Sequence, residues 1–146
     1  METVKIKKLN DKAIMPHKGH EDDAGFDLYA CIPDPVVIQP NKTMLIGTGI
    51  SVELPKGTFG AIFARSGLAT KSGLAPANKV GVVDSPYRGE VMVALHNHSD
   101  MPREISCGER IAQLVVMPYV MCELEWANEL TDTDRGTGGF GSTGKN

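Results

Sequence analysis

Residues 46–54 read Ile-Gly-Thr-Gly-Ile-Ser-Val-Glu-Leu, and every second position of this stretch carries a larger, mostly apolar side chain. A period of two places alternate side chains on opposite faces of an extended chain, so the stretch predicts a β-strand. Further short apolar runs occur at residues 4–6, 36–38, 59–63, 80–83, 91–95, 111–117 and 124–126. Turn residues separate these runs, since the chain holds 16 Gly and 9 Pro. Short strands spaced by about 8–12 residues predict an all-β barrel or sandwich.

Helical patterning is scarce along the chain. The best stretch, residues 66–71, is too short to be stable without tertiary contacts. Residues 135–146 contain five Gly and a single aromatic residue, so they cannot form a core of their own. We therefore expect one β-barrel domain over residues 1–134 and a flexible, Gly-rich arm over residues 135–146.

Composition restricts the class of protein. The 146 residues suit one domain, and 15 Lys+Arg against 18 Asp+Glu give a formal charge of −3. A negative balance argues against a nucleic-acid partner, which favours a basic surface. No run approaches the ~20 apolar residues of a membrane span, and the N-terminus lacks the apolar stretch of a signal peptide. We expect a cytoplasmic protein with three reduced cysteines.

Five segments carry most of the functional signal, and together they are far more specific than any one alone. They are residues 23–30 (DAGFDLYA), 64–69 (ARSGLA), 81–89 (GVVDSPYRG), 108–114 (GERIAQL) and 135–142 (RGTGGFGS). In this order and spacing the set resembles the motifs of the trimeric deoxyuridine triphosphatases, the dUTPases. Two departures are visible: Ala64 stands where that family often has Pro, and Pro86 occupies a position that is often acidic or small.

The resemblance implies a dUTPase-like, jelly-roll-like β-barrel with one short helix and a C-terminal arm that closes over the active site. It implies hydrolysis of dUTP to dUMP and pyrophosphate, which keeps uracil out of DNA and supplies dUMP for thymidylate synthesis. The implied cofactor is Mg²⁺, held by the substrate phosphates and water with no direct protein ligand. The implied assembly is a homotrimer whose sites lie between subunits, with the arm arriving from a third.

Asp84 is the candidate catalytic residue. It follows the apolar run at residues 80–83 and precedes a turn, where a carboxylate can orient a water molecule and accept its proton. From the residues alone, a turn Asp bonded to its own backbone is the favoured alternative. The resemblance makes Asp84 the general base that directs water at the α-phosphorus.

Arg65, Ser66 and Gly67 lie between a predicted strand and the short helix. Ser66 is a good N-cap type, Gly67 lets a phosphate approach the backbone closely, and Arg65 adds a permanently charged fork. An ordinary helix cap is the alternative. Gln113 lies within an apolar run, where its amide must find partners, either a phosphate or neighbouring backbone. The resemblance assigns all four residues to the triphosphate.

The resemblance assigns the nucleoside to residues 78–92. Tyr87 would pack on the deoxyribose and exclude a 2′-hydroxyl, with a partly buried barrel Tyr as the alternative. A hairpin from Asn78 to Asp84 would present backbone donors and acceptors to uracil, because a mismatched base leaves buried groups unpaired. The residues implicated are Asn78, Gly81, Val82, Val83 and Met92, with plain strand core as the alternative for the apolar ones.

The arm supplies the remaining implied contacts. Phe140 would stack on uracil, Arg135 and Ser142 would contact the terminal phosphates, and glycines such as Gly141 would let the segment fold tightly. Ordering costs ~1–2 kcal/mol per residue of backbone entropy, so we expect a loose arm over an empty site. Asp27 would support the site through hydrogen bonds or water, and a purely structural role is equally compatible.

Other interpretations remain open or are weaker. A deoxycytidine triphosphate deaminase of the same fold needs a further acid/base group at cytosine C4, and no extra Glu lies in the hairpin. A non-catalytic, regulatory binding module would not require Asp84, Tyr87 and the arm. His96 and His98 could share one strand face, but no third metal ligand is near in sequence. Residues 139–145 imitate a phosphate-binding loop but lack the strand and helix that it needs.

Overall fold

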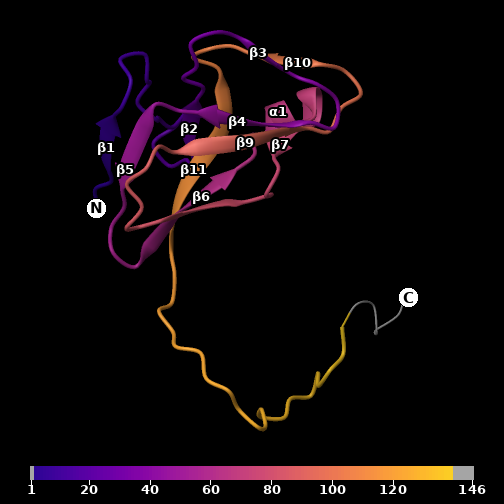
Figure 1. Ribbon diagram of the computed structural model, residues 1–146. Coiled ribbons are helices and arrows are strands. Elements are labelled where there is room, and N and C mark those ends of the chain that lie inside the picture. The colour runs from indigo at the N-terminus through magenta and orange to yellow at the C-terminus, as the bar shows by residue number, and fades with distance from the viewer. Residues whose placement is uncertain (1, 140–146) are drawn as a thin grey trace.

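The protein is described here by a computed structural model, which covers residues 2–139. Short strands dominate it, and one helix, α1 (Ser66–Ser72), interrupts them (Figure 1). The strands are β1 (Lys5–Lys8), β2 (Phe26–Tyr29), β3 (Val36–Ile38), β4 (Thr43–Gly47), β5 (Ile50–Glu53), β6 (Thr58–Phe63), β7 (Leu74–Pro76), β8 (Gly81–Asp84), β9 (Met92–Asn97), β10 (Arg103–Ile105) and β11 (Arg110–Pro118). The predicted all-β fold with one short helix is confirmed.

The strands pair into four small sheets. Their orders are β2-β11-β6-β8, β4-β9-β7, β1-β5 and β10-β3, and the register of every pair is antiparallel. Side chains from all four sheets share one apolar core, which includes Leu28, Ile38, Ile46, Val52 and Leu114. Within residues 2–139, no helix is long and apolar enough to cross a membrane. The shared apolar core packs the four sheets into one body.

The stretch at residues 46–54 forms two strands where the period of two predicted one. Gly49 adopts a φ of +68°, a conformation that glycine tolerates, and the chain turns there from β4 into β5. The alternation also fails to divide buried from exposed residues, because Ser51 is buried with its hydroxyl donating to the Arg88 carbonyl at 2.7 Å. Both faces of β5 are thus covered, by the core and by the 85–90 loop.

The strand expected at residues 124–126 is absent from the described chain. β11 ends at Pro118, and the chain then runs away from the sheets without strand pairing up to residue 139 (Figure 1). Leu124 and Trp126 are 96% and 105% exposed. An extended apolar run needs a partner strand to bond its backbone, and a single chain offers none there. Sequence periodicity alone could not reveal that missing partner.

The hairpin expected from residue 78 to residue 84 is also wrong as a paired hairpin. β7 pairs with β9, whereas β8 pairs with β6, so the two strands that flank this turn belong to different sheets. Lys79 turns the chain between them with a φ of +66°. The turn nevertheless keeps Asn78 beside β8, since both line the same pocket.

Candidate active site

A polar pocket of about 450 Å³ lies where β2, β11 and the start of α1 meet. Its lining brings together four of the residues that sequence assigned to phosphate, from two different motifs, and adds Asp27 from a third. The lining residues are Gly19, His20, Asp23, Ala24, Gly25, Asp27, Arg65, Ser66, Gly67, Arg110, Gln113 and Val115. We call this the Arg65 pocket. Its volume falls within the range of small-ligand sites.

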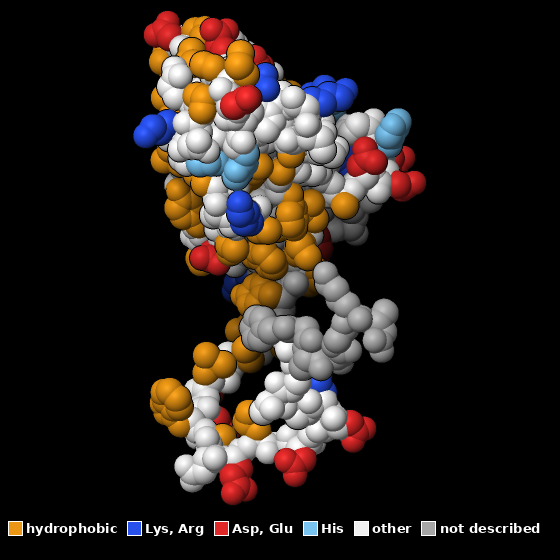
Figure 2. Space-filling model, turned by 90° about the vertical axis from the view of Figure 1, so that its right-hand side faces the viewer, with side chains coloured by type: hydrophobic (Ala, Val, Ile, Leu, Met, Phe, Trp, Pro, Cys, Tyr) orange, Lys and Arg blue, Asp and Glu red, His pale blue; other side chains and the backbone are white. Residues whose placement is uncertain are grey.

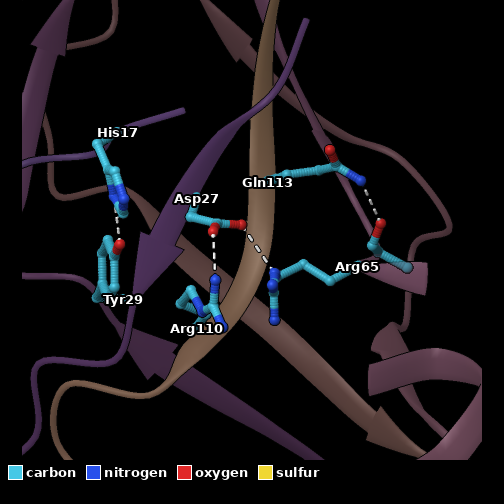
Figure 3. Close-up of polar contacts among 7 residues, drawn as sticks. His17, Asp27, Tyr29, Arg65, Arg110 and Gln113 are labelled. Atoms are coloured by element: carbon cyan, nitrogen blue, oxygen red, sulfur yellow. Dashed lines mark hydrogen bonds and ion pairs between the residues drawn. The ribbon is translucent and has the colours of Figure 1, made fainter. Parts of the chain in front are cut away.

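Asp27 holds two arginines at the edge of the Arg65 pocket (Figure 3). Its Oδ1 accepts a hydrogen bond from Arg65 Nε at 2.7 Å, and its Oδ2 accepts one from Arg110 Nη1 at 3.3 Å. The Asp27 and Arg65 side chains are only 17% and 26% exposed, so solvent screens this pair weakly. Asp23 adds a second carboxylate to the lining, so the pocket carries two positive and two negative side chains, and its guanidinium N–H groups are what it offers to an anion.

Gln113 donates to the main chain of the loop before α1. Its Nε2 donates to the Ala64 carbonyl at 2.8 Å, as Figure 3 shows. A Cβ on Gly25 would collide with the Gln113 amide, so Gly25 leaves the room that this side chain occupies. The backbone partner is the alternative that the sequence left open, and the Gln113 side chain nonetheless lines the Arg65 pocket. Ala64 takes part through its carbonyl, which Pro would also provide.

The expectation that Ser66 caps the helix is wrong. The N-cap residue is Arg65, with φ −84° and ψ 130°, and Ser66 is the first helical residue. No side chain caps α1, because a guanidinium group has no acceptor for the free N–H groups, and the Arg65 side chain donates to Asp27 instead. At its other end α1 closes on Gly73, whose φ of +67° suits glycine. Ser66 and Gly67 remain exposed at the pocket, as their proposed role requires.

A second pocket, the Asp84 pocket, collects the residues assigned to the nucleoside. It is lined by Leu45, Ile62, Asn78, Gly81, Val82, Val83, Asp84, Tyr87, Glu90 and Met92. Val82 and Met92 are 63% and 39% exposed, so the strand-core alternative does not hold for these two side chains. Gly81 packs between Ile62 and Asn78, with a hypothetical Cβ only 3.1 Å from Ile62 Cβ. β8 is the edge strand of its sheet, so the backbone groups on its unpaired side are open to a flat ligand.

Tyr87 is fixed in the loop that follows Asp84. Its backbone N–H donates to the Asp84 carbonyl at 3.0 Å, and its hydroxyl donates to the Glu90 carbonyl at 3.0 Å. A Cβ on Gly89 would collide with the phenol ring, so glycine is required there. Tyr87 is 47% exposed and lines the Asp84 pocket, so it is available to a ligand while still partly buried. Pro86 lies within this closed turn.

The two pockets lie at opposite ends of the β6–β8 pair. Asp84 is paired with Phe59 near the start of β6, whereas Arg65 follows the end of β6 at Phe63. Six residues separate Phe59 from Arg65, or up to about 20 Å along an extended chain. That span is longer than a triphosphate chain, and the two pockets share no lining residue. One chain therefore brings the predicted residues into two groups rather than one site.

The arm residues are only partly described. Arg135 Nε donates to the Gly138 carbonyl at 2.9 Å, and Arg135 lines neither pocket of this chain. Phe140, Gly141 and Ser142 lie outside the described residues, as does most of the phosphate-loop imitation at residues 139–145. The roles predicted for these arm residues remain predictions.

His96 and His98 do lie together. Their ring centroids are 4.4 Å apart, and His96 Nδ1 is 2.8 Å from the Thr43 hydroxyl. Partial desolvation and the neighbouring His96 and Lys79 lower the pKa of His98, so protonation of the His98 ring is disfavoured. Within the part of the chain that the structure describes, no three His, Cys, Asp or Glu side chains converge as metal ligands.

Sequence reasoning missed three side chains near these pockets. Arg110 lies within a quoted motif, and its opposite charge to Asp27 was the available signal. Glu90 lines the Asp84 pocket, with Oε1 accepting from the Gly49 N–H at 2.8 Å. His17 is hydrogen-bonded to the Tyr29 hydroxyl beside Asp27, and nothing in the sequence pairs them. These contacts join segments 12 to 83 residues apart, beyond the reach of local patterns.

Comparison with known proteins shows which family carries these motifs. The family profile for dUTPase matches residues 11–144. The deoxyuridine 5′-triphosphate nucleotidohydrolase of Nautilia profundicola is 49% identical over 142 residues, covering 97% of this chain and 99% of the relative. The protein of the same name from Picosynechococcus sp. is 47% identical over 141 residues, covering 97% and 98%. The solved dUTPase of Staphylococcus bacteriophage 80alpha with dUPNHPP is 29% identical, with a TM-score of 0.90, covering 99% and 100%.

The fold and the two pockets define a nucleotide-binding enzyme of the all-β class. The chain belongs to the dUTPase family, whose members hydrolyse dUTP. The predicted enzyme class and the predicted dUTPase-like fold are both confirmed.

Proposed function

We propose that this dUTPase releases dUMP and pyrophosphate by in-line attack of water on the α-phosphorus, with Asp84 as the general base. The observation that carries this proposal is the convergence of Asp84, Tyr87 and the exposed backbone of β8 in one pocket. In this proposal a sugar packed against Tyr87 lies beside Asp84, whose carboxylate holds the water that attacks the first phosphate. Asp84 is exposed at the end of β8, where water can reach it.

The triphosphate is the anion for which the Arg65 pocket is suited. Arg65, Ser66, Gly67 and Gln113 contact the phosphates, and Asp27 keeps Arg65 in place. The guanidinium donors of Arg65 support the assignment, since charge develops on the phosphate oxygens during the reaction. Asp27 acts through Arg65 rather than on the substrate, because both of its oxygens already accept from arginines.

Mg²⁺ is the cofactor that we propose, held by phosphate oxygens and water. Asp27 and Asp23 are the carboxylates that line the Arg65 pocket, and both already accept protein hydrogen bonds. This fits a metal carried in by the substrate, since Mg²⁺ keeps several waters and prefers substrate phosphates to an all-protein cage. When bound, the ion would neutralise phosphate charge. The protein's own share is to position the substrate and orient water.

We propose that the complete site forms between neighbouring copies in a homotrimer. The Asp84 pocket of one copy would face the Arg65 pocket of the next, because the two pockets of one chain are too far apart for one triphosphate. The segment between β11 and the arm supports the proposal as well. Figure 2 shows apolar side chains along a segment that extends beyond the body, and Val120, Met121, Leu124, Trp126 and Leu130 are 80–105% exposed. Such side chains need cover from another chain.

The arm would then reach the site of another copy. Arg135 and Ser142 would contact the terminal phosphates, Phe140 would stack on uracil, and Gly141 would allow a tight fold over the ligand. The division into a barrel over residues 1–134 and a closing arm over residues 135–146 belongs to this proposal. Ordering the arm costs ~1–2 kcal/mol per residue, which binding of the base and phosphates would offset.

In the cell, this reaction would keep uracil out of DNA and supply dUMP for thymidylate synthesis. A cytoplasmic location is part of the proposal. The free thiols of Cys31, Cys107 and Cys122 support it, since reducing compartments keep cysteines in that form.

Two other functions have specific observations in their favour. Glu90 in the Asp84 pocket is a carboxylate of the kind that a dCTP deaminase needs, although its Oε1 is bonded to Gly49. A regulatory role has a precedent among similar structures, since the phage 80alpha dUTPase is described as controlling transfer of virulence genes. The presence of Asp84, Tyr87 and the arm supports catalysis over a purely regulatory module.

A release assay tests the proposal directly. The protein is incubated with each dNTP and with UTP, with and without Mg²⁺, and pyrophosphate and ammonia are both measured. We expect pyrophosphate from dUTP over many turnovers, dependent on Mg²⁺, and no ammonia from dCTP. Asp84→Asn is the matched control for a contaminating phosphatase. Ammonia release would establish the deaminase, and binding of dUTP without turnover would establish the regulatory module.

A further inference from the structure

Arg110 is the second guanidinium on Asp27, and its place in the reaction is unassigned. Arg65 uses Nε to reach Asp27 Oδ1, so both of its terminal nitrogens remain available to the pocket. Arg110 uses Nη1 to reach the other carboxylate oxygen, Oδ2. Each oxygen of Asp27 thus faces a different arginine, as Figure 3 shows.

We propose that Arg110 is a positioning residue for the phosphate contact of Arg65. By occupying Oδ2 of Asp27, Arg110 limits the Asp27–Arg65 pair to one contact and leaves the terminal N–H groups of Arg65 for the substrate. This inference rests on the proposed phosphate-binding role of Arg65.

The chemistry of the guanidinium group gives the reason. Arginine and a carboxylate prefer a two-contact pair, with two parallel N–H donors on the two oxygens. Without Arg110, the Oδ2 atom of Asp27 would attract a terminal nitrogen of Arg65. That nitrogen would turn from the pocket toward Asp27, and one donor to phosphate would be lost. By bonding to Oδ2 of Asp27, Arg110 prevents this two-contact pair in the enzyme before substrate binds.

A β-bulge aims Arg110 at this carboxylate. Asp27 is paired with Gln113 and Leu28 with Ala112, but Tyr29 is paired with Arg110, so one residue of β11 is extra. In regular pairing Ile111 would lie opposite Tyr29, and Arg110 would share the face of Ala112, which is fully buried. The bulge reverses this: Ile111 is buried at 1% exposure and Arg110 joins the face of Asp27.

Stability alone does not explain this arrangement. The Arg110 side chain is 53% exposed, and ion pairs of that exposure contribute little to folding. Removal of the Arg110 side chain should therefore leave the melting temperature close to that of the parent while the handling of substrate changes. This difference separates a positioning role from a merely structural one.

The test measures KM and kcat for dUTP in Arg110→Ala, Arg110→Lys, Asp27→Asn and the double variant. We expect Arg110→Ala to raise KM about tenfold with kcat changed much less, as for a lost phosphate donor. Arg110→Lys should restore most of the affinity, because an ammonium group can still occupy Oδ2. In the Asp27→Asn background, Arg110→Ala should change KM less than about twofold, since residues that act through one another are not additive.

Controls keep the outcomes distinguishable. Lys56→Ala removes an exposed positive charge from a distant turn and should leave KM unchanged. If Arg110→Ala does not fold, Arg110→Met keeps the apolar stem and takes its place. An equal effect of Arg110→Ala with and without Asp27 would overturn the proposal and make Arg110 a direct ligand, and an unchanged KM would overturn it outright. If Arg65→Ala itself left KM unchanged, the proposed role of Arg65 would fail instead.

Discussion

Asp84 and Arg65 lie at opposite ends of the antiparallel pair formed by β6 and β8. Asp84 is paired with Phe59 near the first residue of β6, and Arg65 comes two residues after its last. Each residue lies in its own pocket, with Tyr87 and Met92 beside Asp84 and with Asp27 and Arg110 beside Arg65. The proposed reaction needs both a water-orienting carboxylate and a phosphate cradle, so we propose that two copies of the chain supply them.

Asp84→Asn should bind substrate but lose turnover. The amide keeps the shape of the side chain and cannot take a proton from water, so we expect kcat to fall about 10²–10⁴-fold. Single-turnover kinetics and titration with a non-hydrolysable dUTP analogue measure the two properties separately. Asp100→Asn, in an exposed turn, is the control. A kcat near the parent value would remove Asp84 from the role of base.

Tyr87→Ala should weaken discrimination between dUTP and UTP. The ring stands at the pocket, fixed by its bond to the Glu90 carbonyl, and its removal opens space for a 2′-hydroxyl. We expect the ratio of kcat/KM for the two substrates to fall about tenfold or more. Tyr87→Phe keeps the ring and should keep most of the discrimination. A ratio that does not change in Tyr87→Ala would show that sugar selection lies elsewhere.

Truncation before Arg135 should leave the barrel folded and impair catalysis. Among residues 2–139 the core contains no residue beyond Val116, so circular dichroism and the melting temperature should match those of the full chain. The kcat/KM for dUTP should fall by at least about 10², because arm contacts that close a site contribute to positioning. Full activity in the truncated protein would falsify the closing role of the arm.

Cys31 should react slowly with alkylating agents. Burial, together with nearby Cys107 and Glu90, raises the pKa of its thiol, so less thiolate is present at neutral pH. A raised pKa means that the labelling rate should climb as the pH rises from about 7.5 to 9.5. Mass spectrometry after iodoacetamide treatment measures this, with exposed Cys122 as the internal comparison. Faster labelling of Cys31 than of Cys122 at pH 7.5 would contradict the packing described for Cys31.

The fold class followed from local patterns, and its details did not. Alternation and turn residues predicted strands, and the structure contains them. Gly49, with its positive φ, divides the stretch at residues 46–54 into two strands. Periodicity could not predict that division, because it does not report the φ of a glycine. The run at residues 124–126 is mostly apolar, yet it pairs with no strand within residues 2–139. Strand pairing depends on what lies alongside, which a single sequence does not reveal.

The candidate site shows the same division. The motifs identified Arg65, Gln113 and Asp84 by residue type and context, and the structure brings each to a pocket. The contacts of Asp27 with two arginines could not be predicted, since they depend on a bulge that turns Arg110 onto the opposite face of β11. Ser66 was expected to cap the helix because of its residue type, but the N-cap residue is Arg65 and Ser66 is the first residue of the helix.

Subunit complementation tests the central claim most directly. Arg65→Ala and Asp84→Asn chains, each inactive alone, are co-expressed with different affinity tags, and oligomers that carry both tags are purified. A cyclic trimer that contains both variants holds one site in which an intact Asp84 meets an intact Arg65 of its neighbour. One active site in three means that kcat/KM, measured at low substrate, should recover to about a third of the parent value. Mixed oligomers as inactive as either parent would show that Asp84 and Arg65 must come from the same chain.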